Sequence, residues 1–181
     1  MEAAPDPPRP GTERIARNGR APFGRYCVSA CLLGLPCRWK GDSKPCEAVE
    51  RLADDPRAEV VPFCPELAAG LGCPRPPIEL VADGADVRAL RVDRTDDATD
   101  ALRAACAAQA DALARAGGVD GFILKSRSPS CGLVAPLHDS DGREIGTAPG
   151  VWAALARKLF PEADFRDETQ VRPAQERFAG R

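Results

Sequence analysis

Three of the eight cysteines in this sequence stand where short apolar segments end, and thiols are its most chemically capable side chains. Cys31 directly follows RYCVSA, Cys64 directly follows EVVPF, and Cys131 lies in the loop after GFIL. If the segments are parallel strands, their carboxyl ends face a single crevice, which is where open α/β sheets bind ligands. We therefore expect the three thiols to converge although they are far apart in the chain.

Three converging thiolates predict a metal centre. Soft sulfur ligands select zinc, copper(I) or iron-sulfur clusters. Proline and glycine beside each cysteine impose tight turns, whose backbone N–H groups suit anionic sulfur. Three thiolates leave one coordination position vacant, and a cubane held in this way keeps one iron open to a substrate. A Cys/His zinc site is less favoured because His138 is the only histidine, in a polar stretch, and we expect it to be a surface residue.

The other five cysteines carry weaker signals. Cys27, within a predicted strand, and Cys106, on the apolar face of a predicted helix, are expected in the core. The sequence does not decide whether Cys37 is a spare ligand, a sulfur acceptor or simply a loop residue. Cys46 and Cys73 lie beside prolines, and structural or incidental roles are expected for both.

The elements that must position these thiols alternate between strand and helix. Strands are predicted at residues 25–30, 59–63 and 121–124, with a weaker fourth at 89–92 (ALRV), and helices at 46–54, 96–116 and 151–160. This alternation predicts a parallel sheet covered on both faces. The expected fold class is α/β, as a single three-layer Rossmann-like domain with a mostly parallel sheet.

Composition divides the 181 residues into three parts. Residues 1–24 hold five prolines and few aliphatic side chains, so we expect a disordered N-terminal extension. The predicted domain spans residues 25–166, and a polar C-terminal tail spans 167–181.

The charge and hydropathy of the chain limit which partners and which cellular compartment we expect for it. The net charge of -2 gives no basic footprint for nucleic acid, and no apolar run approaches the ~20 residues that cross a bilayer. The first residues also lack the apolar run of a secretory signal, so we expect a cytoplasmic protein. We expect it to bind neither nucleic acid nor membrane. We also expect it to be a monomer or a homodimer. In that compartment cysteines favour metal binding or catalysis over disulfides.

Four segments carry a specific resemblance: VSACLLGLPCRWKGD, PFCPELAAGLGCPRPP, LKSRSPSCG and PGVWAALARK. In this order they resemble the bacterial domain-of-unknown-function 523 family, typified by thiouracil desulfidase, over about residues 26–160. The chain departs from the commoner family pattern at Cys73, where a small hydroxyl residue is typical, at Trp39-Lys40, where an aromatic-acid pair is usual, and in its N-terminal extension.

The resemblance implies a Rossmann-like enzyme with an oxygen-sensitive [4Fe-4S] cluster on Cys31, Cys64 and Cys131. The fourth iron would take the sulfur of a small thiocarbonyl substrate, which is replaced by oxygen without net redox change. Glu66 would be the proton-transfer group, and Ser128 a hydroxyl that positions the substrate or relays a proton.

The residues themselves leave alternatives open. The Glu66 carboxylate could equally serve to stabilise a helix N-terminus. Ser128 could equally be a turn residue that caps its own backbone. Lys125, Arg127 and Arg75 read equally as groups that orient an anionic substrate or as solvated charges.

Two other functions fit the same cysteines. A non-catalytic iron-sulfur or sulfur carrier would use Cys37 or Cys73 as an extra thiol. A structural zinc protein would close its site with four thiolates.

Overall fold

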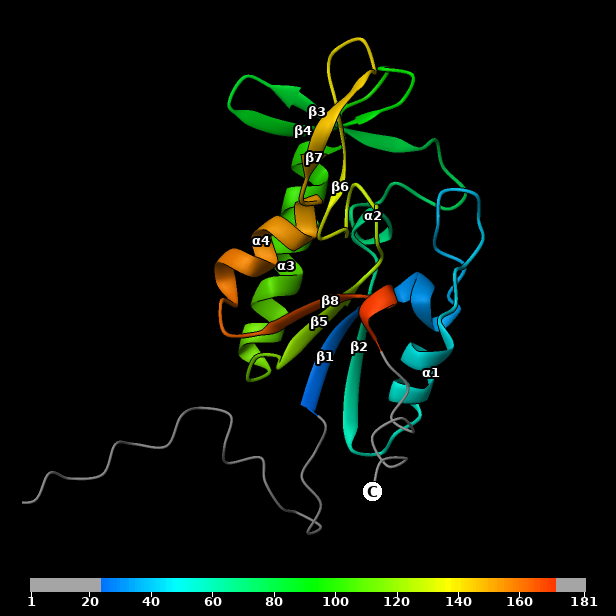
Figure 1. Cartoon of the computed structure of the whole chain (residues 1–181), viewed down its shortest axis with the longest axis vertical. Coiled ribbons are helices and arrows are strands. Elements are labelled where there is room, and N and C mark those ends of the chain that lie inside the picture. Colours follow the sequence, from blue (N-terminus) through cyan, green and yellow to red (C-terminus); the bar gives the residue numbers. More distant parts are fainter. Residues whose placement is uncertain (1–23, 172–181) are drawn as a thin grey trace, which may run out of the picture.

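Two four-stranded sheets form the framework of the protein, and helices pack on both of them (Figure 1). The structure is a computed structural model that describes residues 24–171. The first sheet is parallel, with the order β2-β1-β5-β8: β1 (Gly24–Ser29), β2 (Ala58–Phe63), β5 (Gly121–Leu124) and β8 (Asp164–Asp167). The second is mixed, with the order β4-β3-β6-β7: β3 (Ile78–Asp83), β4 (Asp86–Arg91), β6 (Ala135–His138) and β7 (Glu144–Ala148).

The described part also has four α-helices and two short 3-10 helices, all but the last of which lie between strands along the chain. They are η2 (Ala30–Leu33), α1 (Glu47–Ala53), α2 (Pro65–Ala68), α3 (Thr99–Arg115), α4 (Val151–Leu159) and η3 (Glu168–Gln170). The three helices predicted from the sequence are confirmed as α1, α3 and α4. None of these helices has the length and apolar character that a membrane crossing requires.

The parallel sheet is covered on both faces, because its central strands are apolar on both faces. On one face, Phe122 packs with Trp152 of α4 and Leu113 of α3. On the other, Val28 and Ile123 pack with residues that include Val49 of α1. The predicted α/β class is confirmed, and the three strands predicted first belong to this sheet.

The second sheet corrects the expectation of a single, mostly parallel sheet. The segment ALRV was predicted as a further strand of that sheet, but β4 pairs antiparallel with β3 in the second sheet. Prolines explain why other strands of this sheet were not predicted. Pro76 and Pro77 precede β3, and Pro136 lies within β6. Proline in a sequence argues against a central strand.

His138 belongs to β6, and its side chain is only 17% exposed. Its Nδ1 lies 3.2 Å from the Leu80 carbonyl oxygen and 3.7 Å from a Glu79 carboxylate oxygen. The expectation of an ordinary surface histidine was therefore wrong, because the second sheet half-buries this side chain.

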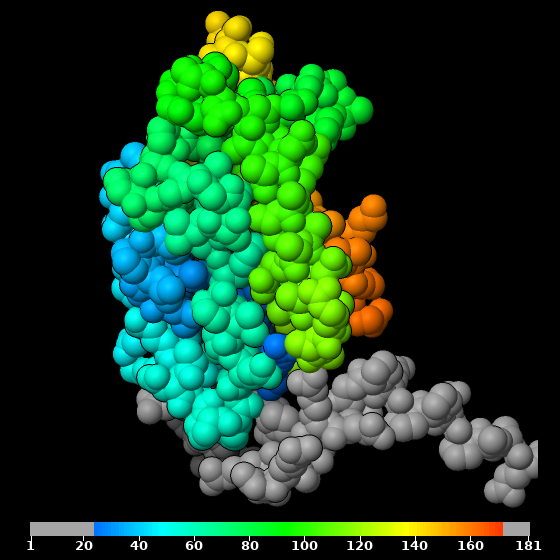
Figure 2. Space-filling model, turned by 180° about the vertical axis from the view of Figure 1, so that it is seen from behind, coloured from blue at the N-terminus to red at the C-terminus, as the bar shows by residue number. Residues whose placement is uncertain are grey.

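The two hairpins of the second sheet leave the parallel sheet directly after cysteine-bearing loops. The β3-β4 hairpin follows Cys64 and α2, and the β6-β7 hairpin follows Cys131. Both return to the parallel sheet through a helix, α3 or α4. Seen from behind, α3 runs from the second sheet down to the parallel sheet (Figure 2), and its Leu102 packs in the second sheet's core with Leu80.

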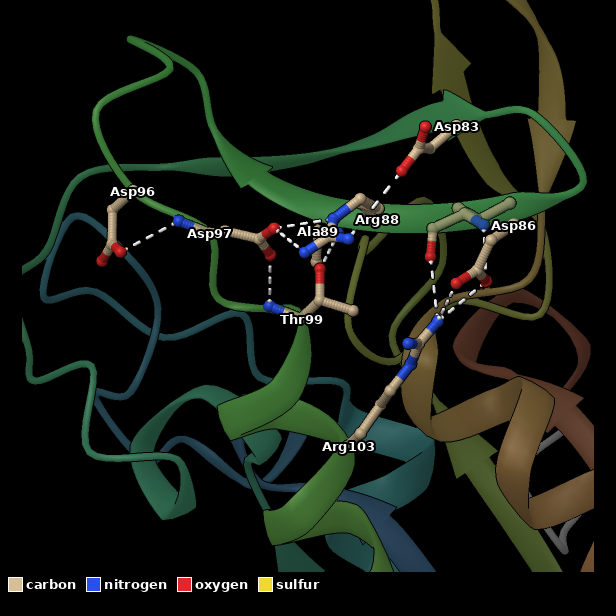
Figure 3. Close-up of polar contacts among 9 residues, drawn as sticks. Asp83, Asp86, Arg88, Ala89, Asp96, Asp97, Thr99 and Arg103 are labelled. Atoms are coloured by element: carbon tan, nitrogen blue, oxygen red, sulfur yellow. Dashed lines mark hydrogen bonds and ion pairs between the residues drawn. The ribbon is translucent and has the colours of Figure 1, made fainter.

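Polar contacts fix the start of α3 against β4 (Figure 3). The Thr99 hydroxyl is fully buried and accepts a hydrogen bond of 2.8 Å from the Ala89 amide. The Asp97 carboxylate accepts from the Thr99 amide at 2.9 Å and pairs with Arg88. The helix predicted from residue 96 therefore begins three residues later, at Thr99, because residues 96–98 are held in the turn that leaves β4.

The predicted chain ends fall mostly outside the described residues. The N-terminal extension lies outside them except for Gly24, the first residue of β1. The predicted polar tail begins at Asp167, the last residue of β8, and continues into η3, and residues 172–181 lie outside the description.

Candidate metal centre

The three strand-end cysteines line one cavity of about 340 Å³, which is within the size range of ligand pockets. Cys31 lies in η2 directly after β1, Cys64 joins β2 to α2, and Cys131 lies in the loop after β5. Glu66 and Ser128 line the same cavity. All five residues singled out from the sequence thus come together beyond the carboxyl ends of parallel strands.

The order of the parallel sheet explains this location. The chain passes from β1 to β2 through α1 on one face, and from β2 to β5 through α3 on the other. The neighbours β1 and β5 therefore flank a topological switch point, where α/β sheets have a crevice. Pro77 and Ile78, at the start of β3, line the cavity from the second sheet.

A fourth thiol, that of Cys37, reaches the cavity and is only 3% exposed. It forms hydrogen bonds with the thiols of Cys31 and Cys64. The bond to Cys31 and burial raise the pKa of the Cys37 thiol to about 11, although the bond to Cys64 lowers it. The sequence left Cys37 open, and the structure puts it beside two of the three predicted ligands.

Burial and neighbouring groups raise the pKa values of the Cys64 and Cys131 thiols. The hydrogen bond with Cys37, together with burial, raises the pKa of the Cys64 thiol far above its usual range. Burial raises the pKa of the Cys131 thiol in the same direction. Metal binding would have to displace the thiol protons, as it does for cysteine ligands generally.

The donor set fits an iron-sulfur cluster. Within residues 24–171, no three Cys, His, Asp or Glu side chains are grouped closely enough to hold a single metal ion. The cavity lining includes four cysteines, and His138 is not part of it. Several soft thiolates around one cavity match a cluster, in which each ligand binds a different iron.

The remaining cysteines lie outside the cavity lining. Cys27 and Cys106 are fully buried in the core on the α3 face, as expected, and burial raises the pKa of each thiol to about 12. Cys46 is the N-cap residue of α1. The exposed Cys73 thiol donates to the Pro36 carbonyl at 3.1 Å.

Glu66 is buried in the first turn of α2, with 9% of its surface exposed. Its Oε2 accepts a hydrogen bond of 2.7 Å from Arg75 Nε, within a buried ion pair. The same guanidinium donates to the carbonyls of Gly72 at 2.7 Å and Cys37 at 3.0 Å. Arg75, whose role the sequence left open, is therefore a clamp on the Glu66 carboxylate.

Ser130 is a polar residue of the cavity that the sequence did not single out. It is 1% exposed, and its hydroxyl donates to Oε1 of Glu66. Its only signal in the sequence is its place directly before Cys131. Ser128 is the turn residue suggested by its type, because its Oγ accepts from the Cys131 amide at 3.1 Å. Its Oγ also lies 3.3 Å from that of Ser130.

The loop that carries Ser128, Ser130 and Cys131 is fixed by the N-terminus of α4. The amide of Gly150 donates to the Gly132 carbonyl at 2.8 Å, and the amide of Trp152 donates to the Ser130 carbonyl at 2.8 Å. A Cβ on Gly150 would come within 2.9 Å of backbone atoms of this loop. The close approach of loop and helix therefore requires glycine at position 150.

The loop after β5 is also held in place by η3. The Glu168 carboxylate pairs with Lys125, accepts from the Ser126 amide at 2.8 Å and from its hydroxyl at 2.7 Å. Lys125, whose role the sequence left open, is therefore an ion-pair partner. Arg127, at the exposed tip of the loop, has a φ of 58°, a conformation rare for a non-glycine residue, which loops at functional sites more often adopt.

Comparisons with known proteins agree with this site. The model of a family described as 2-thiouracil desulfurase matches residues 27–168. The uncharacterized protein YbbK of Bacillus subtilis (strain 168) is 35% identical over 136 residues, which cover 72% of this chain and 88% of YbbK. The solved structure of the [4Fe-4S]-dependent thiouracil desulfidase TudS is similar with a TM-score of 0.64 and 31% identity, over 81% of this chain and 92% of TudS.

The Gly150→Ala substitution should destabilise the protein by about 2 kcal/mol or more, because the new methyl group meets backbone atoms that cannot rotate away. Gly146→Ala is the matched control, since no atom lies within 4 Å of a Cβ built there. Chemical denaturation of both variants measures the difference. Equal stabilities would contradict the proposed packing of loop and helix.

The Glu168→Gln substitution should lower the free energy of unfolding by about 1 kcal/mol at pH 7. Burial would raise the pKa of the Glu168 carboxyl, but the bonds from Lys125 and Ser126 hold it below its ordinary value of 4.5. A lowered native pKa adds stability above pH 4.5 that is lost as pH falls through the native value.

The difference between wild type and Glu168→Gln should therefore shrink below pH 4.5. Denaturation at a series of pH values checks this dependence. Glu162→Gln, at an exposed position before β8, is the control and should leave stability unchanged. A difference for Glu168→Gln that persisted at the acid end would show that its charge plays no part.

Proposed function

The chain belongs to the 2-thiouracil desulfurase family, and from this we propose that it is a desulfidase acting on a small thiocarbonyl compound such as 2-thiouracil. The overall reaction exchanges sulfur for oxygen, so that the thiocarbonyl group and water give a carbonyl group and hydrogen sulfide. No electrons are gained or lost in this balance. The desulfidase domain of this proposal spans residues 25–166.

One observation carries the proposal: three cysteines from three strand ends and a buried carboxylate line the same cavity. The similarity to TudS, a [4Fe-4S]-dependent enzyme, supports a cluster at this place. We assign Cys31, Cys64 and Cys131 as the three ligands of a [4Fe-4S] cluster. When bound, such a cluster supplies a Lewis-acidic iron with a position free for a sulfur atom.

The chain's own groups supply positioning and proton transfer. Glu66 accepts the proton of the attacking water, a general-base contribution that is typically worth 10²- to 10⁴-fold in rate. Arg75 holds the carboxylate in place through the 2.7 Å contact, so that its orientation is fixed before substrate arrives. Ser128, less buried than Ser130, presents its hydroxyl at the cavity wall.

The Cys64→Ser substitution should abolish stable cluster binding, because it removes one of three ligands. Protein purified without oxygen is analysed for iron and acid-labile sulfide, and wild type should contain about four of each per chain. Cys73→Ser is the control, since its thiol lies off the cavity and serine keeps a hydroxyl for the same carbonyls. Full cluster content in Cys64→Ser would refute the ligand assignment, and one zinc per wild-type chain would favour the structural zinc alternative.

Cluster-loaded wild type should release sulfide from 2-thiouracil, and Glu66→Gln should do so at least 100-fold more slowly while keeping its iron. Sulfide release under anaerobic conditions is the measurement. A full cluster without turnover of any of several thioamides would instead identify an iron-sulfur or sulfur carrier. Unchanged turnover in Glu66→Gln would remove this carboxylate from the mechanism.

A further inference from the structure

We propose that Ser130 relays a proton between Glu66 and Ser128, so that the carboxylate acts on the reacting water through two hydroxyl groups. This inference rests on the proposed desulfidase function and specifies how its proton transfer is arranged. It adds to the site a residue that neither the sequence nor the family resemblance pointed out.

Counting protons fixes the direction of the chain of hydrogen bonds. An ionised carboxylate only accepts hydrogen bonds, so the bond between Ser130 and Oε1 of Glu66 uses the single hydroxyl proton of Ser130. At the 3.3 Å contact between the two serines, Ser130 must therefore accept and Ser128 must donate. The Ser128 Oγ in turn accepts the Cys131 amide proton at 3.1 Å and has a further lone pair for a ligand in the cavity.

Burial decides which member of the chain meets the substrate. Ser130 is 1% exposed and Glu66 is 9% exposed, whereas Ser128 is only partly buried. Each oxygen of Glu66 already accepts one hydrogen bond, Oε2 from Arg75 and Oε1 from Ser130. Because Ser128 is the most exposed of the three residues, its hydroxyl is the end of the chain at which a water or substrate atom is received.

Hydrogen bonds from the surrounding residues hold Ser130 and Glu66 in place. Ser130 is fixed through its carbonyl, which accepts from the Trp152 amide at 2.8 Å. Glu66 is fixed by Arg75, whose guanidinium is anchored on the carbonyls of Gly72 and Cys37. The hydroxyls are thus aligned before substrate binds, as efficient proton transfer requires.

The transfer balances without another reactant. As the water oxygen bonds to the thiocarbonyl carbon, its proton passes to Oγ of Ser128. The Ser128 proton passes to Oγ of Ser130, and the Ser130 proton passes to Oε1 of Glu66. Both serines end neutral, and the proton on Glu66 returns along the same path to the departing sulfur. The second proton of the water, left on the new hydroxyl group, leaves along this path in turn as the carbonyl forms, so that the products are the carbonyl compound and hydrogen sulfide.

A double-mutant cycle tests the relay in the cluster-loaded full chain, with 2-thiouracil as substrate. Ser130→Ala and Ser128→Ala should each lower kcat by about 100-fold while KM changes by less than about threefold. The double variant should be no slower than the slower single variant, because one break already interrupts the chain. Independent structural roles predict losses that multiply, to about 10⁴-fold.

Thr99→Val is the matched control, because it removes a fully buried hydroxyl that is not part of the cavity lining. Its kcat should stay within about twofold of wild type. Iron and acid-labile sulfide are measured in every variant to show that the site is loaded. If Ser130→Ala fails to fold or to load, the cycle of Ser128→Ala with Glu66→Gln decides, since the relay predicts the same lack of multiplication for its two ends.

The outcomes separate the relay from the function on which it rests. An active wild type with non-multiplying losses supports the relay. An active wild type in which Ser130→Ala keeps full kcat, or in which the losses multiply, overturns the relay alone. A loaded wild type that releases no sulfide overturns the proposed function and the relay with it.

Discussion

The register of β1 with its two parallel neighbours is the constraint on which the whole site depends. Ser29, the last residue of β1, lies opposite Phe63, the last residue of β2. On the other side, the Lys125 amide directly after β5 donates to the Ser29 hydroxyl at 2.9 Å. The three strands therefore end level, and the cysteine that follows each of them reaches the same crevice. A slip of one residue in either pairing would turn the side chains of a strand to the opposite face.

Level strand ends bring the cysteines near one another, and the loops then have to be held rigid. The loop after β5 is fixed from two directions, by the α4 N-terminus through Gly150 and by Glu168 of η3. The β2 side is fixed by the buried pair of Glu66 and Arg75. Burying two charges costs more than their attraction returns unless further hydrogen bonds satisfy them. Here Ser130 and two backbone carbonyls supply those bonds, so the pair is held in one geometry and serves the site more than it serves stability.

Much of this site follows from the sequence, because the proposed ligands are marked by their positions in the chain. Cys31, Cys64 and Cys131 directly follow recognisable strands or lie in the next loop, and the order of parallel strands dictates that they converge. The core placement of Cys27 and Cys106 also followed from local periodicity alone.

What the sequence did not predict depends on contacts between distant segments. The second sheet was missed because prolines interrupt its strands and because its pairing of β3 with β6 joins residues more than fifty positions apart. Ser130 and Arg75 become important only through contacts with Glu66, and no local pattern marks either of them. The partner of Lys125 was missed for the same reason, since Glu168 lies 43 residues further along the chain.

The most direct test of the central claim is an anaerobic crystal structure of the iron-loaded protein, with anomalous scattering recorded at the iron absorption edge. We predict one compact set of iron peaks inside the cavity, bonded to Sγ of Cys31, Cys64 and Cys131, with one iron free of protein sulfur and the Sγ of Cys37 unbound. Iron peaks outside the cavity, or a cluster held by Cys37 in place of Cys131, would contradict this prediction.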